Sequence, residues 1–114
     1  MTEQPVLAHL SLIDEAERFK PEENKAGRRA EILIKENDLR VTLITMRAGI
    51  ELDEHSAAGT ATIQVLEGRF EVSYTGGSVT LGPGELCSLR RDVKHSVKAV
   101  KSGAFLLTLG WTTS

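Results

Sequence analysis

The sequence has little of what stabilises small secreted proteins or lets a chain enter a membrane. Its 114 residues include one cysteine, Cys87, which excludes an internal disulfide and a zinc site built from paired cysteines. No apolar run approaches the roughly 18 residues that a membrane-spanning helix needs. Residues 1–10 lack the basic start and apolar stretch of a signal peptide. We therefore expect a cytoplasmic protein with no membrane association.

Excess positive charge and aromatic rings are also scarce. The chain carries 14 Lys and Arg against 16 Asp and Glu, for a net charge of -2, so no basic surplus is available to neutralise phosphates. Three Phe, one Tyr and one Trp are too few for a platform on which bases stack. Glycine motifs that bind nucleotides are absent. Nucleic acid is therefore not an expected partner. A small enzyme, a small-molecule binding protein and an interaction domain remain open.

The apolar content is sufficient for one hydrophobic core. Apolar residues make up 40% and charged residues 26% of the chain, which is typical of one soluble domain of this length. The first 28 residues are polar, so we expect an extension over residues 1–28 and a domain over residues 29–114. Ser11 and Asp14 have capping-box spacing, which predicts a helix of about two turns ended by Pro21. An exposed loop is expected over residues 21–27.

Short segments with β-strand character follow from Arg29 onward. Thr60–Leu66 alternates polar and apolar residues, as a half-buried strand does. Gly76-Gly77 predicts a hairpin, and further turns are predicted at Glu67-Gly68 and Ser102-Gly103. Strands are expected over residues 32–35, 40–46, 60–66, 69–75, 78–81, 86–89, 95–100 and 104–111. This succession, with little helix, predicts an all-β sandwich or barrel.

Two segments narrow the fold class further. Gly49, His55 and Gly68 have the spacing of the first sequence motif of the cupin family, and Gly84 and His95 have that of the second. The resemblance extends over residues 40–110 or so and implies a jelly-roll barrel, the double-stranded β-helix of cupins, with a short helix-containing N-terminal extension. It also implies that both histidines face one cavity.

The resemblance bears on assembly as well. Small cupins commonly pair, so a homodimer is expected, with the N-terminal segment covering the partner. Leu106 and Leu107 break strict alternation, which predicts burial on both faces of their strand. A central strand, or a sheet face covered by a partner subunit, would produce such burial.

The metal site of the family is incomplete in this chain. Cupins that bind a metal use two histidines and a glutamate from the first motif and a histidine from the second. The corresponding positions here hold His55, Ala57, Ala61 and His95. An alanine methyl group cannot coordinate a metal. A divalent transition metal held by two imidazoles alone would bind weakly and need further ligands.

Three interpretations of His55 and His95 stay open. They form a metal site completed by water, Gln64, Glu51 or Glu54, or a metal-free pair that binds a ligand or transfers protons. The third interpretation is a structural remnant, a pair that is hydrogen-bonded inside the barrel or partly solvated. Because Gln64 alternates with the apolar residues beside it, strand parity places it on the face opposite the cavity unless a bulge intervenes.

Two other residues are candidates. Arg90, followed by Arg91, stands where the second motif has a proline and precedes His95, near the expected mouth of the cavity. A guanidinium there could hold an anionic group of a ligand. Cys87 lies within a predicted strand, where a free cysteine usually acts as a small buried apolar residue.

The favoured function is small-molecule binding or sensing by a cupin barrel with an incomplete metal site. The alternative is a cupin-type enzyme, such as an oxygenase or isomerase. It would use His55 and His95 either with a weakly held divalent metal or by metal-free acid–base chemistry. A third hypothesis is an interaction protein whose barrel is filled by its own side chains. The resemblance selects no reaction, because one fold supports many functions.

Overall fold

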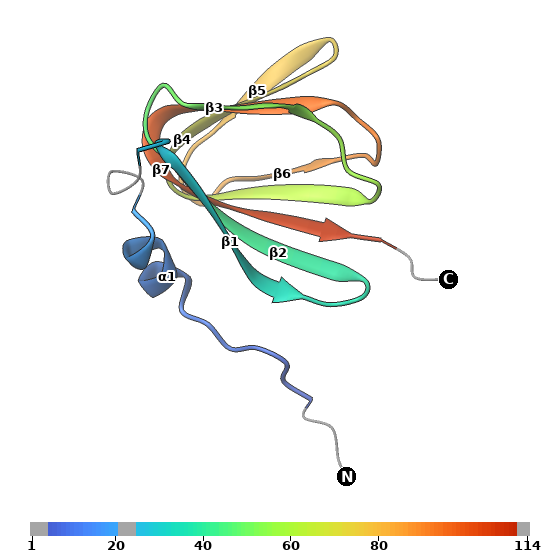
Figure 1. Ribbon diagram of the computed structural model, residues 1–114. Helices are drawn as coiled ribbons and strands as arrows, with labels where there is room; N and C mark the ends of the chain where they lie inside the picture. Colours follow the sequence, from blue (N-terminus) through green and yellow to red (C-terminus); the bar gives the residue numbers. More distant parts are fainter. Residues whose placement is uncertain (1–4, 21–24, 112–114) are drawn as a thin grey trace.

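The computed structural model describes residues 5–20 and 25–111 of the chain (Figure 1). One short helix precedes a succession of strands. The elements in chain order are α1 (Leu12–Arg18), β1 (Arg28–Lys35), β2 (Leu39–Met46), β3 (Glu51–His55), β4 (Thr60–Tyr74), β5 (Gly77–Leu81), β6 (Leu86–Leu89) and β7 (His95–Gly110).

The long strands β4 and β7 each take part in two sheets. The first half of β4 pairs with the second half of β7, from Thr60↔Gly110 onward, and the second half of β4 pairs with the first half of β7, as far as Tyr74↔His95. The first pairing lies in a sheet of order β1–β2–β7–β4–β6, and the second lies in a sheet of order β3–β7–β4–β5. All pairs are antiparallel, and the two sheets curve into a barrel (Figure 1). The all-β jelly-roll prediction is confirmed.

The predicted turns at Glu67-Gly68 and Ser102-Gly103 are wrong. Both glycines lie inside continuous strands, where the register of β4 against β7 shifts near Glu67 and Arg69. A Cβ atom on Gly103 would overlap the backbone carbonyl of Glu67, and Gly68 has a φ of +84°. These glycines therefore permit the two strands to bend while their backbones stay in close contact. They do not reverse the chain.

Strand β3 was not expected from the sequence. It pairs with β7 through Glu51↔Lys98 and Leu52↔Val97. Four of its five residues are exposed, and only Leu52 is half-buried. An edge strand of this kind has polar residues on both faces and gives no period-two signal.

The apolar residues form two cores on opposite faces of the β2–β7–β4 sheet. The barrel interior is filled mainly by Ile44, Met46, Ile63, Val65, Phe70, Val72, Val97 and Phe105. The second core lies under α1, where Ala16 packs with Leu43, Ala104 and Leu106. Leu106 thus faces the helix, and Leu107 packs against the barrel interior. The chain's own helix accounts for the two-sided burial of this strand.

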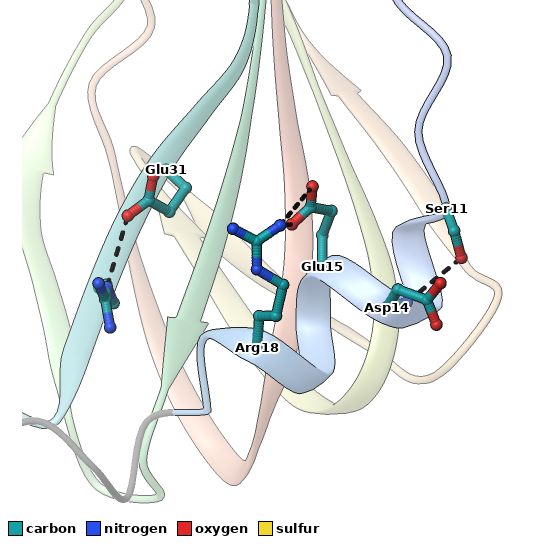
Figure 2. Close-up of polar contacts among 6 residues, drawn as sticks. Ser11, Asp14, Glu15, Arg18 and Glu31 are labelled. Atoms are coloured by element: carbon teal, nitrogen blue, oxygen red, sulfur yellow. Dashed lines mark hydrogen bonds and ion pairs between the residues drawn. The ribbon is translucent and has the colours of Figure 1, made fainter.

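Helix α1 begins as the sequence predicts. The Ser11 hydroxyl accepts a hydrogen bond from the backbone N–H of Asp14 at 3.3 Å, and Arg18 pairs with Glu15 at 3.1 Å (Figure 2). The helix ends at Arg18; the predicted role of Pro21 lies outside the described residues. No helix in residues 5–20 or 25–111 is long and apolar enough to cross a membrane.

Candidate functional site

A cavity of about 380 Å³ opens at one end of the barrel. The start of β2, the β3–β4 connection and the end of β7 gather there, at the right-hand side of Figure 1. Apolar and small residues dominate its wall, and a few polar groups interrupt them. The lining consists of Arg40, His55, Ser56, Ala57, Ala58, Gly59, His95, Leu107, Leu109 and Trp111.

Strand pairing brings the two motif histidines together in this cavity. His55 ends β3, His95 begins β7, and the two residues are direct partners in the β3–β7 ladder. Their ring centroids lie 4.2 Å apart, with the ring planes tilted by 60°. His95 is only 2% exposed, whereas His55 is exposed at the cavity mouth.

Each imidazole is oriented by a backbone carbonyl two residues earlier in the chain. His55 Nδ1 lies 2.9 Å from the Asp53 carbonyl oxygen, and His95 Nδ1 lies 3.1 Å from that of Val93. A carbonyl oxygen only accepts, so Nδ1–H donates in each pair, and Nε2 carries the free lone pair when the ring is neutral. His95 Nε2 is buried and has no hydrogen-bond partner. The cavity therefore contains an unused hydrogen-bond acceptor.

Burial favours the neutral form of His95. Desolvation lowers the pKa of His95, the hydrogen bond to the Val93 carbonyl opposes this shift, and the nearby His55 lowers the pKa further. The His95 ring is therefore neutral at pH 7, which keeps the Nε2 lone pair available.

The residues at this site do not form a complete metal-binding set. Each imidazole has the orientation of a metal ligand, with Nδ1–H fixed by a carbonyl. However, within the described parts of the chain no carboxylate or thiol joins the two histidines in a group of three. Ala57 lines the cavity, and Ala61 is buried in the barrel. Glu51 and Glu54 are both exposed. Two imidazoles do not fit an ordinary catalytic metal centre, which uses about three protein ligands.

Two candidates from the sequence lie away from the cavity. Gln64 is exposed, pairs with Leu86 and Leu106, and alternates with the buried Ile63 and Val65. Arg90 lines a separate groove. The structure brings neither residue to the two histidines.

Cys87 shares the groove of Arg90. The side chain is half-buried and packs against the barrel core. Burial raises the pKa of the Cys87 thiol, and a backbone hydrogen bond involving Ile63 partly offsets this shift. The thiol is therefore protonated at neutral pH and is a poor nucleophile.

Sequence reasoning missed Arg40 and Trp111 as cavity residues. Arg40 has the same strand parity as Ile44 and Met46, whose side chains fill the barrel interior. An arginine in phase with interior residues is a signal that could have placed it there. Its guanidinium carbon lies 5.9 Å from the centre of the Trp111 ring.

Asp92, in the connection between β6 and β7, has a backbone conformation that glycine adopts more readily than other residues. Its φ is +65°, and it is the one non-glycine residue with positive φ among residues 5–20 and 25–111. Its backbone N–H donates to the Ala57 carbonyl at 2.7 Å. This hydrogen bond joins the β6–β7 connection to the β3–β4 connection beside the cavity.

Comparisons with known proteins extend these observations. No protein-family model and no curated protein matches the sequence. A cupin superfamily protein from Desulfitobacterium hafniense superposes with a TM-score of 0.72 and 13% identity, over 75% of this chain and 78% of that one. An RmlC-like cupin from Shewanella frigidimarina superposes with a TM-score of 0.69 and 22% sequence identity, over 75% of this chain and 77% of that one. Salicylate 1,2-dioxygenase from Pseudoaminobacter salicylatoxidans, solved with gentisate, superposes with a TM-score of 0.68 and 22% sequence identity, over 74% of this chain and 25% of the enzyme.

These similarities concern the fold. They agree with the antiparallel barrel that the strands of this chain form. The chain is a small domain with the cupin fold.

Proposed function

We propose that this protein binds a small molecule in the cavity beside His55 and His95, without requiring a resident metal ion. The buried Nε2 atom of His95, which has no partner, is the observation that carries the proposal. A buried acceptor left unsatisfied costs about 1–3 kcal/mol. A ligand that donates a hydrogen bond to it would offset this cost and be oriented by it.

The size and lining of the cavity support the same function. Its volume of about 380 Å³ lies within the range of small-molecule sites, about 300–1,000 Å³. Leu107, Leu109 and Trp111 supply apolar surface, and the two imidazoles supply polar groups. Such a wall, with few fixed polar atoms, is the usual composition of a ligand pocket.

Ligand-induced stabilisation in a cavity-filling variant tests the proposal. Ala57→Trp places an indole in the cavity, and Ala48→Trp introduces the same side chain at an exposed position away from the cavity lining. The wild type and these two variants are screened by thermal shift against several classes of small molecule. A ligand at 100 times its Kd adds about 2.7 kcal/mol to stability.

At least one class of compound should raise the Tm of the wild type and of Ala48→Trp but not that of Ala57→Trp. Absence of stabilisation by any class, or equal stabilisation of all three proteins, would contradict binding in this cavity.

The second candidate function is acid–base catalysis by the histidine pair. The buried, neutral His95 can accept a proton, and the exposed His55 lies beside it, with the ring centroids 4.2 Å apart. A second version of this candidate function is catalysis with a divalent transition metal that the same two imidazoles hold weakly. Both versions predict that His55→Ala/His95→Ala abolishes turnover. A turnover unchanged in that double variant would exclude both.

A further inference from the structure

Arg40 brings an uncompensated positive charge to the cavity wall. Its Nε atom is buried without a hydrogen-bond partner. No Asp or Glu among residues 5–20 and 25–111 forms an ion pair with it. The residues opposite it in the flanking strands are Lys35 and Leu109, and neither carries negative charge.

The fold holds this guanidinium beside an apolar surface. Its carbon atom lies 5.9 Å from the Trp111 ring centre, and Leu107 and Leu109 line the same cavity. The buried side-chain atoms without partners in the described residues are Arg40 Nε, Thr45 Oγ1 and His95 Nε2. Two of these three belong to residues that line this cavity, one a donor and one an acceptor.

The donor and the acceptor define the chemistry of a matching ligand. A carboxylate is a planar anion that accepts the N–H groups of a guanidinium. One arginine balances one carboxylate, whereas a phosphate group carries about -1.5 to -2 charge at pH 7 and needs more donors. The apolar wall requires a body of hydrocarbon character. A hydroxyl on that body could donate to His95 Nε2.

We propose that the cavity takes a small monocarboxylate with an apolar body and that Arg40 anchors its carboxylate. This inference rests on the proposed binding function and adds the chemical class of the ligand. It gives Arg40 the anion-binding role that the sequence predicts for Arg90, which lies in another groove.

Isothermal titration calorimetry with matched probes tests the proposal. The probes are benzoate, 3-hydroxybenzoate and 4-methylpentanoate, each paired with its primary amide, together with inorganic phosphate. Each amide preserves the shape of its acid and removes the charge. The proteins are the wild type, Arg40→Met, Arg40→Lys and the control Arg69→Met, which removes an exposed arginine outside the cavity lining.

The wild type and Arg69→Met should bind at least one acid more tightly than its amide. Arg40→Met should weaken binding of that acid about tenfold to a hundredfold, the range for a charged hydrogen-bonded pair, and leave the amide unchanged. Arg40→Lys should retain part of the affinity, because an ammonium keeps the charge without the planar fork. The Tm of unliganded Arg40→Met should equal or exceed that of the wild type, because the variant removes a buried unpaired donor.

The contrary outcomes are distinct. Equal binding of acid and amide, unaffected by Arg40→Met, would overturn the role of Arg40 and leave the cavity as a binding site. Phosphate binding that depends on Arg40, with no acid bound, would overturn the monocarboxylate class. If no acid binds at millimolar concentration, the inference fails. The Ala57→Trp screen then decides independently whether the cavity binds any ligand.

Discussion

At the scale of single residues, the burial of His95 makes the free energy of unfolding depend on pH. Its pKa in the folded protein is lowered from 6.5 chiefly by burial. Between the folded and unfolded pKa values the unfolded chain binds more protons, so the free energy of unfolding rises with pH there. The contribution of His95 is fully favourable above pH 6.5 and is lost as the pH falls towards the lowered pKa.

We expect the free energy of unfolding to decrease as the pH is lowered from 7 through 6.5, by at most about 1.4 kcal/mol per pH unit from this one group. His95→Gln should flatten that dependence. His9→Gln, in the exposed N-terminal arm, is the matched control and should keep the wild-type slope. Urea unfolding at several pH values measures how the free energy of unfolding changes with pH. A wild-type slope in His95→Gln would contradict the assignment of this pH dependence to His95.

The candidate site could be predicted only in part from individual residues. The spacing of His55 and His95 was informative, because two motifs of fixed length place them in adjacent strands. Arg40 gave a weaker signal, since an arginine near a strand end is more often a solvated edge residue. The free Nε atom that distinguishes it depends on packing against Trp111 and its neighbours, which no local pattern contains.

At the scale of secondary-structure elements, the shared bend of the paired strands β4 and β7 depends on close backbone contact. A side chain on Gly103 would meet the backbone of Glu67 and Gly68. Gly103→Ala should therefore destabilise the protein by about 2–3 kcal/mol. Neither β4 nor β7 can move away without breaking backbone pairing with its other neighbouring strand. Urea unfolding measures the change.

Gly77→Ala is the control for this prediction. A Cβ on Gly77 would lie 3.4 Å from the Tyr74 hydroxyl, near ordinary contact distance. Its effect should stay within about 0.5 kcal/mol, as for most surface substitutions. Equal effects of the two variants would show that the bend tolerates a side chain.

The same bend explains why sequence patterns misplaced the boundaries of these strands. A glycine after a polar residue ends a strand in a hairpin, but it also lets a long strand bend and continue. Glu67-Gly68 and Ser102-Gly103 belong to the second case, because they face each other across the β4–β7 ladder. Strand β3 left no alternating pattern, because most of its residues are exposed at a sheet edge.

At the scale of the whole molecule, the fold class was predictable and the layering was not. Alternation in Thr60–Leu66 and the cupin-like spacings were enough for a jelly-roll barrel. The adjacent Leu106 and Leu107 predicted a strand buried on both faces, either a central strand or one whose sheet face a partner subunit covers. The structure shows that α1 covers this face, with Ala16 packed against Leu106. Helix α1 is short, and its docking is a tertiary event that local propensity does not encode.

For the molecule as a whole, we propose that the barrel cavity binds a small molecule without a resident metal. The physical basis of this proposal is the donor set, in which His55 and His95 have no third ligating carboxylate or thiol among the described residues. Elemental analysis of untagged protein purified without chelator, compared with His55→Ala/His95→Ala, tests it most directly. We predict far less than one transition metal per chain in both samples. Near-stoichiometric metal in the parent, lost in the double variant, would contradict the account and make the two histidines a working metal site.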